Sequence, residues 1–300
     1  MKLLITLLTN HDLNRLKRLV KSVQYLYHEN YIELDVYIVV NTLNDEYYKS
    51  VLDSNFPFKV IRTESNGKPG KGKNSCMEIF SNGDWDFVTV FDGDDFFYPT
   101  FLNSIANHVK HYPSLDVLGS IPSDFIATWH PNSGHTFEFK CNDRKFWGSI
   151  WGVSMCHGRY GRPYGPGRGA WLDIDLPGNS DKLILLSKRA VRQRMYEEIG
   201  NGEDHLFSMQ LLKEHQLGKL RYFQSMSSDF FVHDRTLDDN IQKKFPQELE
   251  VNIMKEKMLE YVSEDRSNLD ELPIIFKDLL LSYRDKMKYI ARIHSESIIS

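Results

Sequence analysis

The chain has 300 residues, of which 41% are hydrophobic and 26% charged, and its formal net charge is -4. This composition is ordinary for a globular enzyme and argues against a protein that is basic overall, although a basic patch can still form locally. The three cysteines are odd in number and form no CxxC pair, so neither a disulfide framework nor a zinc site is expected. A reducing compartment, the cytoplasm, fits this cysteine usage best.

The apolar start at residues 1–8 is interpreted as a buried first strand. The apolar run stops at the polar residues 9–12, and no small-residue cleavage site of a signal peptide follows. No stretch of the sequence approaches the roughly 20 apolar residues that a membrane-spanning helix requires. The chain is therefore expected to be soluble, or at most peripheral to a membrane.

Strand and helix patterns alternate over the first 120 residues. They predict strands at 2–8, 35–40, 58–61 and 86–91, and helices at 12–28, 44–52, 74–80 and 99–111, the first of them capped by Asp12. This alternation predicts an α/β fold with a mostly parallel central sheet and helices on both faces. Ligands of such sheets bind at the carboxyl ends of the strands.

The pattern breaks between residues 140 and 178, where Gly, Trp, Tyr and Arg are frequent and no period is sustained. A long irregular segment in a compact domain is usually a functional loop. Regular structure is predicted to resume with a strand at 182–186, a helix of about ten residues capped by Ser187, a helix at 203–215, a strand pair near 220–223 and 229–232, and helices over 237–300.

Three acidic residues, Asp92, Asp94 and Asp95, follow the predicted strand 86–91. Crowded carboxylates repel one another unless a cation offsets their charge. Hard divalent ions such as Mg²⁺ or Mn²⁺ prefer oxygen ligands and bridge readily to a diphosphate. The alternative is a solvated acidic turn, but the position after a buried strand, at the ligand edge of the sheet, favours a metal and diphosphate site.

A series of short motifs leads up to this cluster, in the order Asn66-Gly67, Gly72-Lys73-Asn74, Gly83-Asp84-Trp85 and Asp92-Gly93-Asp94-Asp95. Their order resembles the donor half of GT-A fold glycosyltransferases, with the last motif in the place of the DXD motif. It is most similar to the large inverting family that includes cellulose and chitin synthases. The resemblance covers about residues 2–110 and resumes near 182–233.

The resemblance implies an enzyme, a hexosyl- or pentosyltransferase, that uses Mn²⁺ or Mg²⁺ and a nucleotide-sugar donor, of which a UDP-sugar is the first choice. It divides the chain into a GT-A domain at 1–236 and a helical extension at 237–300. Residues 1–120 would then bind the nucleotide sugar and residues 121–236 the acceptor. The extension would pack on the domain or mediate self-association into a homo-oligomer.

Roles for the donor-site residues follow from the same resemblance. Asp92 would contact the donor ribose and the metal, Asp94 would be the main metal ligand, and Asp95 would contact the sugar or support the site. The remaining residues expected to bind the donor are Thr9, Asn10, Asn41, Lys73 and Asn74. Asn41 stands where the family usually has an acid that reads the nucleobase, which leaves uridine open, and Lys73 stands where an Arg is frequent and could meet the diphosphate as a point charge.

A second acidic motif, Glu203-Asp204, begins a predicted helix 110 positions after the metal motif, counted from Asp94 to Asp204. Acids in the first turn of a helix are favoured by the helix dipole alone, which is the structural alternative. In the resembled family the Asp of such a pair is the catalytic base. Asp204, with Glu203 beside it, is therefore predicted to take the proton of the acceptor hydroxyl as that oxygen attacks the anomeric carbon with inversion.

His233 follows a short apolar stretch and is a candidate metal ligand, because several GT-A enzymes complete the metal's coordination with a late His. A lone His is more often structural, and that alternative stays open.

The segment 140–194 is basic in a chain that is acidic overall. It holds 11 Lys or Arg and 4 acids, a surplus of seven positive charges. Basic groups interleaved with aromatic ones are typical of a phosphate-bearing or stacked partner, so the acceptor could be a lipid phosphate or a modified base in DNA as well as a glycan. The alternative is a Gly-rich lid whose Arg residues meet the donor diphosphate. The acceptor or lid residues predicted here are Arg159, Arg162, Arg168 and Trp171.

One rival interpretation concerns residues 67–74, which nearly fit the P-loop pattern G-x-x-x-x-G-K-[ST] of an NTPase or kinase. The pattern fails at Asn74, where a hydroxyl should reach the metal. It also leaves Asp94, Asp95 and the Glu203-Asp204 pair without roles.

Overall fold

The computed structural model describes residues 1–93, 95–120, 124–127, 135–141, 144–150, 182–192, 194–200, 202–225, 227, 229–235, 274–275 and 281–296. In chain order its elements are β1 (Lys2–Thr9), α1 (Leu13–Gln24), β2 (Glu33–Val40), α2 (Asp45–Asp53), β3 (Lys59–Arg62), α3 (Pro69–Asn82), β4 (Phe87–Asp92), β5 (Asp95–Phe97), α4 (Phe101–His111), β6 (Val117–Ser120), β7 (Asp124–Ala127), β8 (His135–Cys141), β9 (Arg144–Ile150), β10 (Lys182–Ser187), α5 (Lys188–Val191), α6 (Glu203–Gln216), β11 (Tyr222–Ser225), β12 (Phe231–Arg235), β13 (Ile274–Ile275) and α8 (Tyr283–Glu296).

The central sheet has eight strands in the order β13-β11-β6-β10-β4-β1-β2-β3. Its strands run parallel except β10, which is antiparallel to both of its neighbours, β4 and β6. The predicted α/β fold with a mostly parallel sheet is therefore confirmed, as are the four strands and four helices expected in the first 120 residues. Asp12 caps α1 as predicted, because its side chain accepts from the backbone N–H groups of Asn14 and Arg15.

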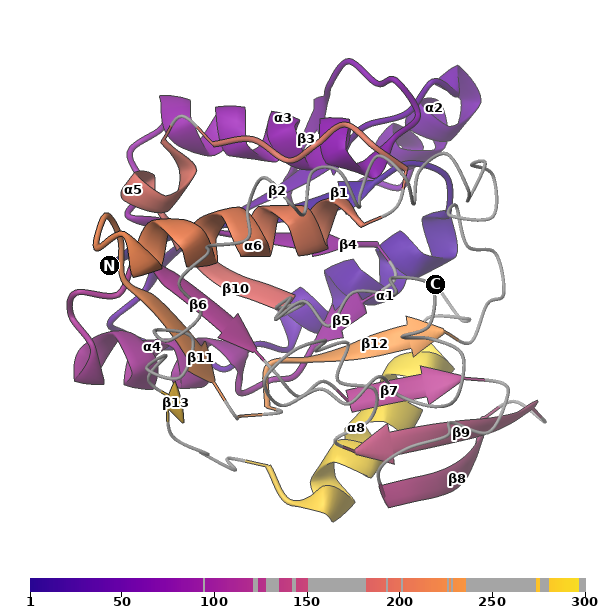
Figure 1. Cartoon of the computed structure of the whole chain (residues 1–300). Helices are drawn as coiled ribbons and strands as arrows, with labels where there is room; N and C mark the ends of the chain where they lie inside the picture. The colour runs from indigo at the N-terminus through magenta and orange to yellow at the C-terminus, as the bar shows by residue number, and fades with distance from the viewer. Residues whose placement is uncertain are drawn as a thin grey trace, which may run out of the picture.

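Helices cover both faces of this sheet, as the alternation of β1 requires. Leu3, Ile5 and Leu7 of β1 face a core shared with α1, α2 and α4. Leu4 and Leu8 face the other core, which α3 and α6 complete. Figure 1 shows α3 and α6 together on one side of the sheet. Apolar side chains cover both faces of the sheet, so the polar side chains of these strands gather at the strand ends.

A second, five-stranded sheet in the order β5-β12-β7-β9-β8 was not predicted. Its hairpin β8–β9 falls on residues 135–150, so the expectation of an irregular segment from residue 140 is wrong for its first part. The two strands predicted near 220–223 and 229–232 are present as β11 and β12, but their pairing with each other is wrong, since β11 joins the first sheet beside β6 and β12 joins the second between β5 and β7. Which strands pair is decided by segments that lie far apart in the chain, and local hydrophobic periodicity cannot predict it.

Two helix lengths differ from prediction for identifiable reasons. α3 extends over 14 residues instead of about seven, because Pro69 at its first turn is compatible with a helix start. α5 has four residues instead of about ten, although Ser187 caps it as expected by accepting from the N–H of Ala190. Residues 194–200 leave the helix because their backbone is held against α3 instead.

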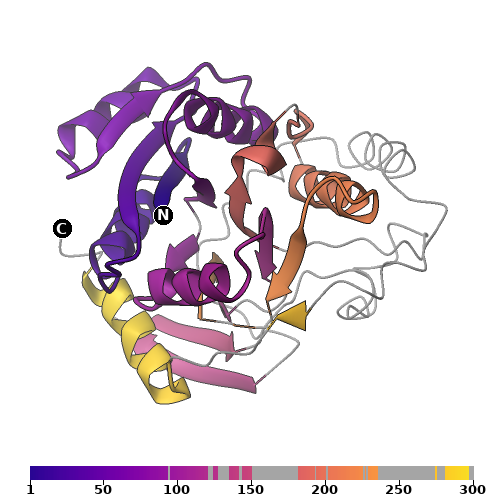
Figure 2. The same ribbon diagram turned by 90° about the vertical axis from the view of Figure 1, so that its left-hand side faces the viewer.

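The C-terminal helix α8 packs against the second sheet through a small core of its own, which contains Phe96, Val232, Ile290 and Ile293. Figure 2 shows α8, in yellow, alongside this sheet. Buried charges reinforce the contact. Lys286 Nζ lies 2.9 Å from Asp229 Oδ1, and both side chains are almost completely buried.

A second buried ion pair joins α1 to β12, with Arg18 Nη1 2.7 Å from Asp234 Oδ2. His294 of α8 contacts the same carboxylate through Nε2 at 3.4 Å. Helix α8, which lies in the expected extension 237–300, therefore packs as part of the same domain. None of the helices in the described ranges is long and apolar enough to cross a membrane.

Replacing Lys286 with Met should lower the free energy of unfolding by about 3–5 kcal/mol, because the change leaves the Asp229 carboxylate buried without its ammonium partner. Urea unfolding followed by circular dichroism measures this. The matched control is Lys219→Met, which removes a surface ammonium that is 58% exposed and should change stability by less than about 0.5 kcal/mol. Equal stability of the two variants would contradict a buried ion pair at α8.

Candidate active site

The carboxyl ends of β1, β2 and β4 meet at one edge of the central sheet. The register pairs Leu8 with Asp92 and Thr9 with Val40, so Thr9, Asn41 and Asp92 emerge together. α6 begins at Glu203 on the same edge. The structure therefore brings Asp92 and the predicted catalytic pair to one site, although Asp92 and Glu203 lie 111 positions apart in the chain.

A lysine on α3 connects these two groups of acids. Lys73 Nζ lies 2.6 Å from Asp204 Oδ1, 2.7 Å from Glu203 Oε1 and 3.5 Å from Asp92 Oδ2. Its side chain is only 3% exposed and lies 5.6 Å from the ring centre of Tyr196. Burial alone would lower the pKa of Lys73, but the carboxylates of Asp204, Asp92 and Glu203 outweigh it and raise that pKa well above its ordinary value. The three carboxylates therefore favour the ammonium form of Lys73.

A second lysine, which the sequence analysis did not single out, neutralises the other acids of the site. Lys182 Nζ lies 2.9 Å from Asp95 Oδ2 and 3.2 Å from Asp92 Oδ2. Burial would lower the pKa of Lys182, but the carboxylates of Asp95 and Asp92 raise it. Burial would conversely raise the pKa of Asp92, and the ammonium groups of Lys73 and Lys182 hold it below its usual range.

His233 lies where β12 pairs with β5, and its Nδ1 is 2.5 Å from Asp95 Oδ1. Burial would raise the pKa of Asp95, whereas Lys182 and His233 act in the opposite direction and lower it. The structure thus places His233 beside the acidic cluster. Metal ligation by His233 stays a prediction.

The acids differ in their access to solvent. The Asp204 side chain is 47% exposed, whereas that of Glu203 is 7% exposed and that of Asp95 is fully buried. Burial raises the pKa of Glu203 above its ordinary value although Lys73 acts against the shift. Of the two adjacent acids on α6, Asp204 is the one that a bound molecule can reach.

Three other predicted donor residues form internal contacts. The Asn41 amide donates to Thr63 Oγ1 at 3.0 Å and to the Glu64 carbonyl at 2.7 Å, which ties the ends of β2 and β3 together. Thr9 shares a hydrogen bond with the Tyr47 hydroxyl, and Asn10 contacts His11. Donor contacts by these residues stay predictions.

Asn74 holds the segment 194–200 against α3. Its Nδ2 donates to the Tyr196 carbonyl at 2.9 Å, and its Oδ1 accepts from the Tyr196 N–H at 2.7 Å. Gly70 allows the close approach, because a Cβ there would lie 2.0 Å from the Glu197 carbonyl oxygen. Tyr196 is thereby placed to stack on Phe207 of α6, with ring centres 4.1 Å apart.

The same geometry removes the P-loop alternative. Gly70, Gly72 and Lys73 lie inside α3, which begins at Pro69, so residues 69–74 form no loop that could surround a phosphate with backbone N–H groups. The Asn74 side chain points to a protein backbone and not toward the acidic cluster.

Hard divalent cations fit the donor set at this edge. Asp92 and Asp95 already direct one oxygen each at the same ammonium, so their carboxylates converge on a single positive group. Within the described ranges no group of three or more His, Cys, Asp or Glu side chains could hold a metal ion. Mg²⁺ commonly uses only one or two protein carboxylates and completes its shell with phosphate and water, so two carboxylates are sufficient protein ligands.

Asp94 and the predicted acceptor or lid residues Arg159, Arg162, Arg168 and Trp171 lie outside the described residues.

The sequence matches the family described as glycosyl transferase family 2 over residues 5–195, which is more than half of the chain. The chain belongs to glycosyl transferase family 2. The predicted membership of the GT-A glycosyltransferases is thereby confirmed. A search of curated proteins found no match.

Among solved structures the family 2 chain is similar to TarS of S. aureus. A crystal structure of TarS 1–349 in complex with UDP-GlcNAc is 16% identical, with a TM-score of 0.54 over 91% of this chain and 70% of that chain. A second structure of TarS 1–349 is 15% identical, with a TM-score of 0.50 over 97% and 78%. The chain spans 47% of a longer TarS chain. At these identities the similarity shows the fold alone.

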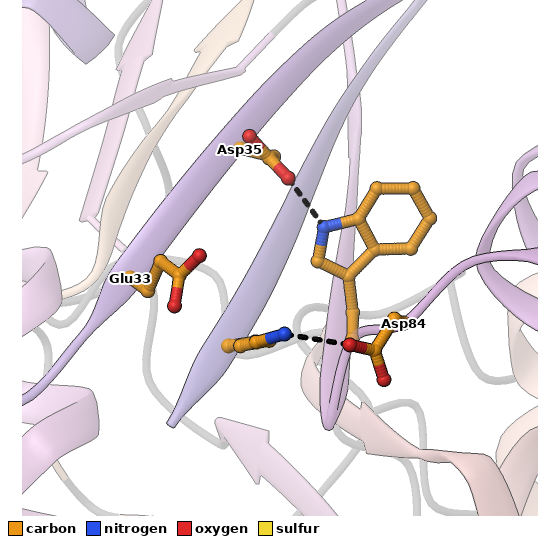
Figure 3. A pocket seen from close by; sticks show the side chains of 5 residues that line it. Glu33, Asp35 and Asp84 are labelled. Carbon is orange, nitrogen blue, oxygen red and sulfur yellow. Dashed lines mark hydrogen bonds and ion pairs between the residues drawn. The ribbon is translucent and has the colours of Figure 1, made fainter.

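Two other polar regions of this glycosyltransferase lie away from the site. A cavity of about 180 Å³ is lined by Lys2, Glu33, Asp35, Asp84 and Trp85 (Figure 3). It lies at the start of β1 and β2, the sheet edge opposite the donor site. Lys2 Nζ lies 2.6 Å from Asp84 Oδ2, and Trp85 Nε1 donates a hydrogen bond to Asp35 Oδ2 at 2.7 Å.

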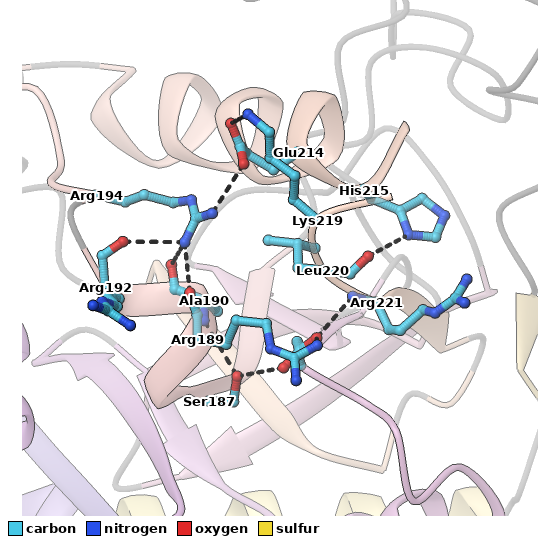
Figure 4. Close-up of polar contacts among 11 residues, drawn as sticks. Ser187, Arg189, Ala190, Arg192, Arg194, Glu214, His215, Lys219, Leu220 and Arg221 are labelled. Carbon is cyan, nitrogen blue, oxygen red and sulfur yellow. Dashed lines mark hydrogen bonds and ion pairs between the residues drawn. The ribbon is translucent and has the colours of Figure 1, made fainter. Parts of the chain in front are cut away.

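The basic residues at the end of the segment 140–194 also lie away from the donor edge. Figure 4 shows Arg194 bonded to Glu214 and to carbonyls of α5, and Arg189 Nη1 lies 3.4 Å from Asp116 Oδ2. Because β10 runs antiparallel to β4, Ser187 pairs with Phe87 at the start of β4, whereas Asp92 ends that strand. These arginines therefore support α5 and α6 rather than the donor site.

Replacing Asn74 with Ala should lower the free energy of unfolding by about 2–4 kcal/mol, because the buried N–H and C=O groups of Tyr196 both lose their partner. Urea unfolding of the purified protein checks this value. Asn103→Ala is the control, since the half-buried Asn103 donates one side-chain hydrogen bond, to Glu29, and its loss should cost less than about 1 kcal/mol. A stable N74A variant with impaired donor binding would show instead that Asn74 contacts the donor.

Proposed function

We propose that this family 2 enzyme transfers a sugar from a UDP-sugar to an acceptor hydroxyl in one displacement with inversion. The observation that carries the proposal is the position of Lys73, whose Nζ lies within 3.5 Å of both the predicted donor acid Asp92 and the predicted base Asp204. The anomeric carbon of a donor at Asp92 would then lie near Asp204. The choice of UDP is supported by the similar fold of TarS, which has been solved with UDP-GlcNAc.

Asp204 acts as the general base in this proposal. It is the exposed member of the acidic pair, and its carboxylate can accept the proton of an acceptor hydroxyl as that oxygen forms its bond to the anomeric carbon. The bond from that carbon to the diphosphate breaks in the same step. Glu203 is buried against Lys73 and would fix the lysine, and with it Asp204, in position.

Mg²⁺ or Mn²⁺ would bind between the carboxylates of Asp92 and Asp95 and the donor diphosphate, with Asp94 and His233 as further candidate ligands. Such an ion stabilises negative charge on a departing diphosphate. Lys73 would add a buried positive charge on the other side of Asp92, in a water-poor site where it is worth more than in bulk water.

The acceptor is proposed to be a glycan, a lipid phosphate or a modified DNA base, with Arg159, Arg162, Arg168 and Trp171 as acceptor or lid residues. The basic excess of residues 140–194 supports a phosphate-bearing acceptor. We also propose a domain boundary at residue 236, self-association through residues 237–300 and a cytoplasmic location.

Replacing Asp204 with Asn should lower kcat by about 100-fold or more while UDP-sugar binding is retained, because the amide cannot accept the acceptor proton. Release of UDP with and without acceptor, and donor binding by calorimetry, measure the two quantities. Asp84→Asn is the matched control, since Asp84 is a 95% exposed acid whose side chain pairs with Lys2 at the start of β1, the opposite edge of the sheet. Full turnover by D204N would reject the base assignment.

Salt should distinguish the acceptor classes. If the acceptor carries several phosphates, raising NaCl from about 50 to 200 mM should weaken acceptor binding at least tenfold, because released counterions favour binding at low salt. Anisotropy of labelled DNA and flotation of vesicles with anionic lipids measure this, with a neutral glycan as control. Binding that ignores salt would point to a neutral glycan.

A further inference from the structure

The Lys182 ammonium lies between Asp92 and Asp95, where the proposed divalent cation would bind. β10 is antiparallel to β4, so its first residue lies beside the carboxyl end of β4, where Asp92 stands. The Lys182 ammonium is 2.9 Å from one oxygen of Asp95 and 3.2 Å from one of Asp92. The two carboxylates therefore share one positive group, as they would share a metal ion.

Lys73, the second ammonium of the site, cannot neutralise the Asp92–Asp95 pair. Lys73 is held by Glu203 and Asp204 at 2.6–2.7 Å and reaches Asp92 only at 3.5 Å. Asp95 is fully buried, and its second oxygen is taken by His233. Among the described residues, Lys182 is thus the principal counter-ion of the Asp92–Asp95 pair.

An ammonium and a dication cannot both occupy this position, because like charges a few ångströms apart repel strongly in a partly buried site. Lys182 is 19% exposed and ends a flexible four-carbon stem, so its head can move toward solvent or toward a diphosphate oxygen. The rings of Phe91 and Phe231, with centres 5.2 and 6.0 Å from Nζ, support the stem in the contact seen here.

We propose that Lys182 is a built-in counter-ion that bridges Asp92 and Asp95 in the donor-free enzyme and competes with the divalent cation for this carboxylate pair. The proposal rests on the proposed function, since it takes this pair to hold the metal of the donor complex. Metal binding is then weak until a diphosphate arrives and provides Lys182 with another anionic partner. Metal and nucleotide consequently increase each other's affinity, as reciprocal linkage requires.

The test measures Mn²⁺ binding without any sugar transfer, by electron paramagnetic resonance of free Mn²⁺ and by calorimetry. Lys182→Met should bind Mn²⁺ at least tenfold more tightly than the natural protein in the absence of nucleotide. Addition of UDP should narrow this difference, because UDP strengthens Mn²⁺ binding to the natural protein more than to the variant. Lys182→Arg, which retains the charge, should bind Mn²⁺ as the natural protein does.

Lys219→Met is the matched control, because it removes an equal charge from the far end of α6 and should leave Mn²⁺ binding unchanged. Lys182→Gln gives the same comparison if the methionine variant folds poorly. Unchanged or weaker Mn²⁺ binding by both neutral variants would overturn the role of Lys182 but leave the proposed metal site standing. If neither the natural protein nor the variants bind Mn²⁺ with UDP present, the metal part of the proposed function fails as well.

Discussion

The site depends on the burial of one ammonium ion among three carboxylates. Lys73 leaves water almost completely, which is costly unless opposite charges surround it. Asp92, Glu203 and Asp204 provide those charges from β4 and α6, while Lys73 itself comes from α3. The electrostatic requirement of a single side chain thus fixes the relative position of three elements, and with it the separation of Asp92 and Asp204, the predicted donor acid and the predicted base.

Packing around α3 makes this arrangement possible. Gly70 lets the segment 194–200 approach the helix, and Asn74 then pairs with the backbone of Tyr196. Tyr196 in turn stacks on Phe207 of α6. Asn74 was expected to bind the donor. Its observed contacts instead help to position α6, the helix that carries Glu203 and Asp204.

The second sheet and α8 support the same site from the other side. β5 carries Asp95, and β12 carries His233 toward it and Asp234 toward Arg18 and His294. Because Asp95 and Asp234 are both buried and charged, a shift of β12 would expose or orphan several charges at once. The C-terminal helix thus helps to hold the acidic cluster although it lies far from it in sequence.

The sequence alone determined the α/β class, the strands and helices of residues 1–111 except β5, and the two acidic motifs, because period-2 and period-3.6 patterns and caps are local properties of the chain. Only the tertiary structure decided that β10 runs antiparallel and that β11 and β12 join different sheets. For that reason Lys182, the first residue of an apolar strand, could not be recognised as a partner of Asp92 and Asp95. A pattern reports which face of a strand is buried, whereas ion pairs between distant segments depend on strand order and direction, which are settled by pairing and packing over the whole chain.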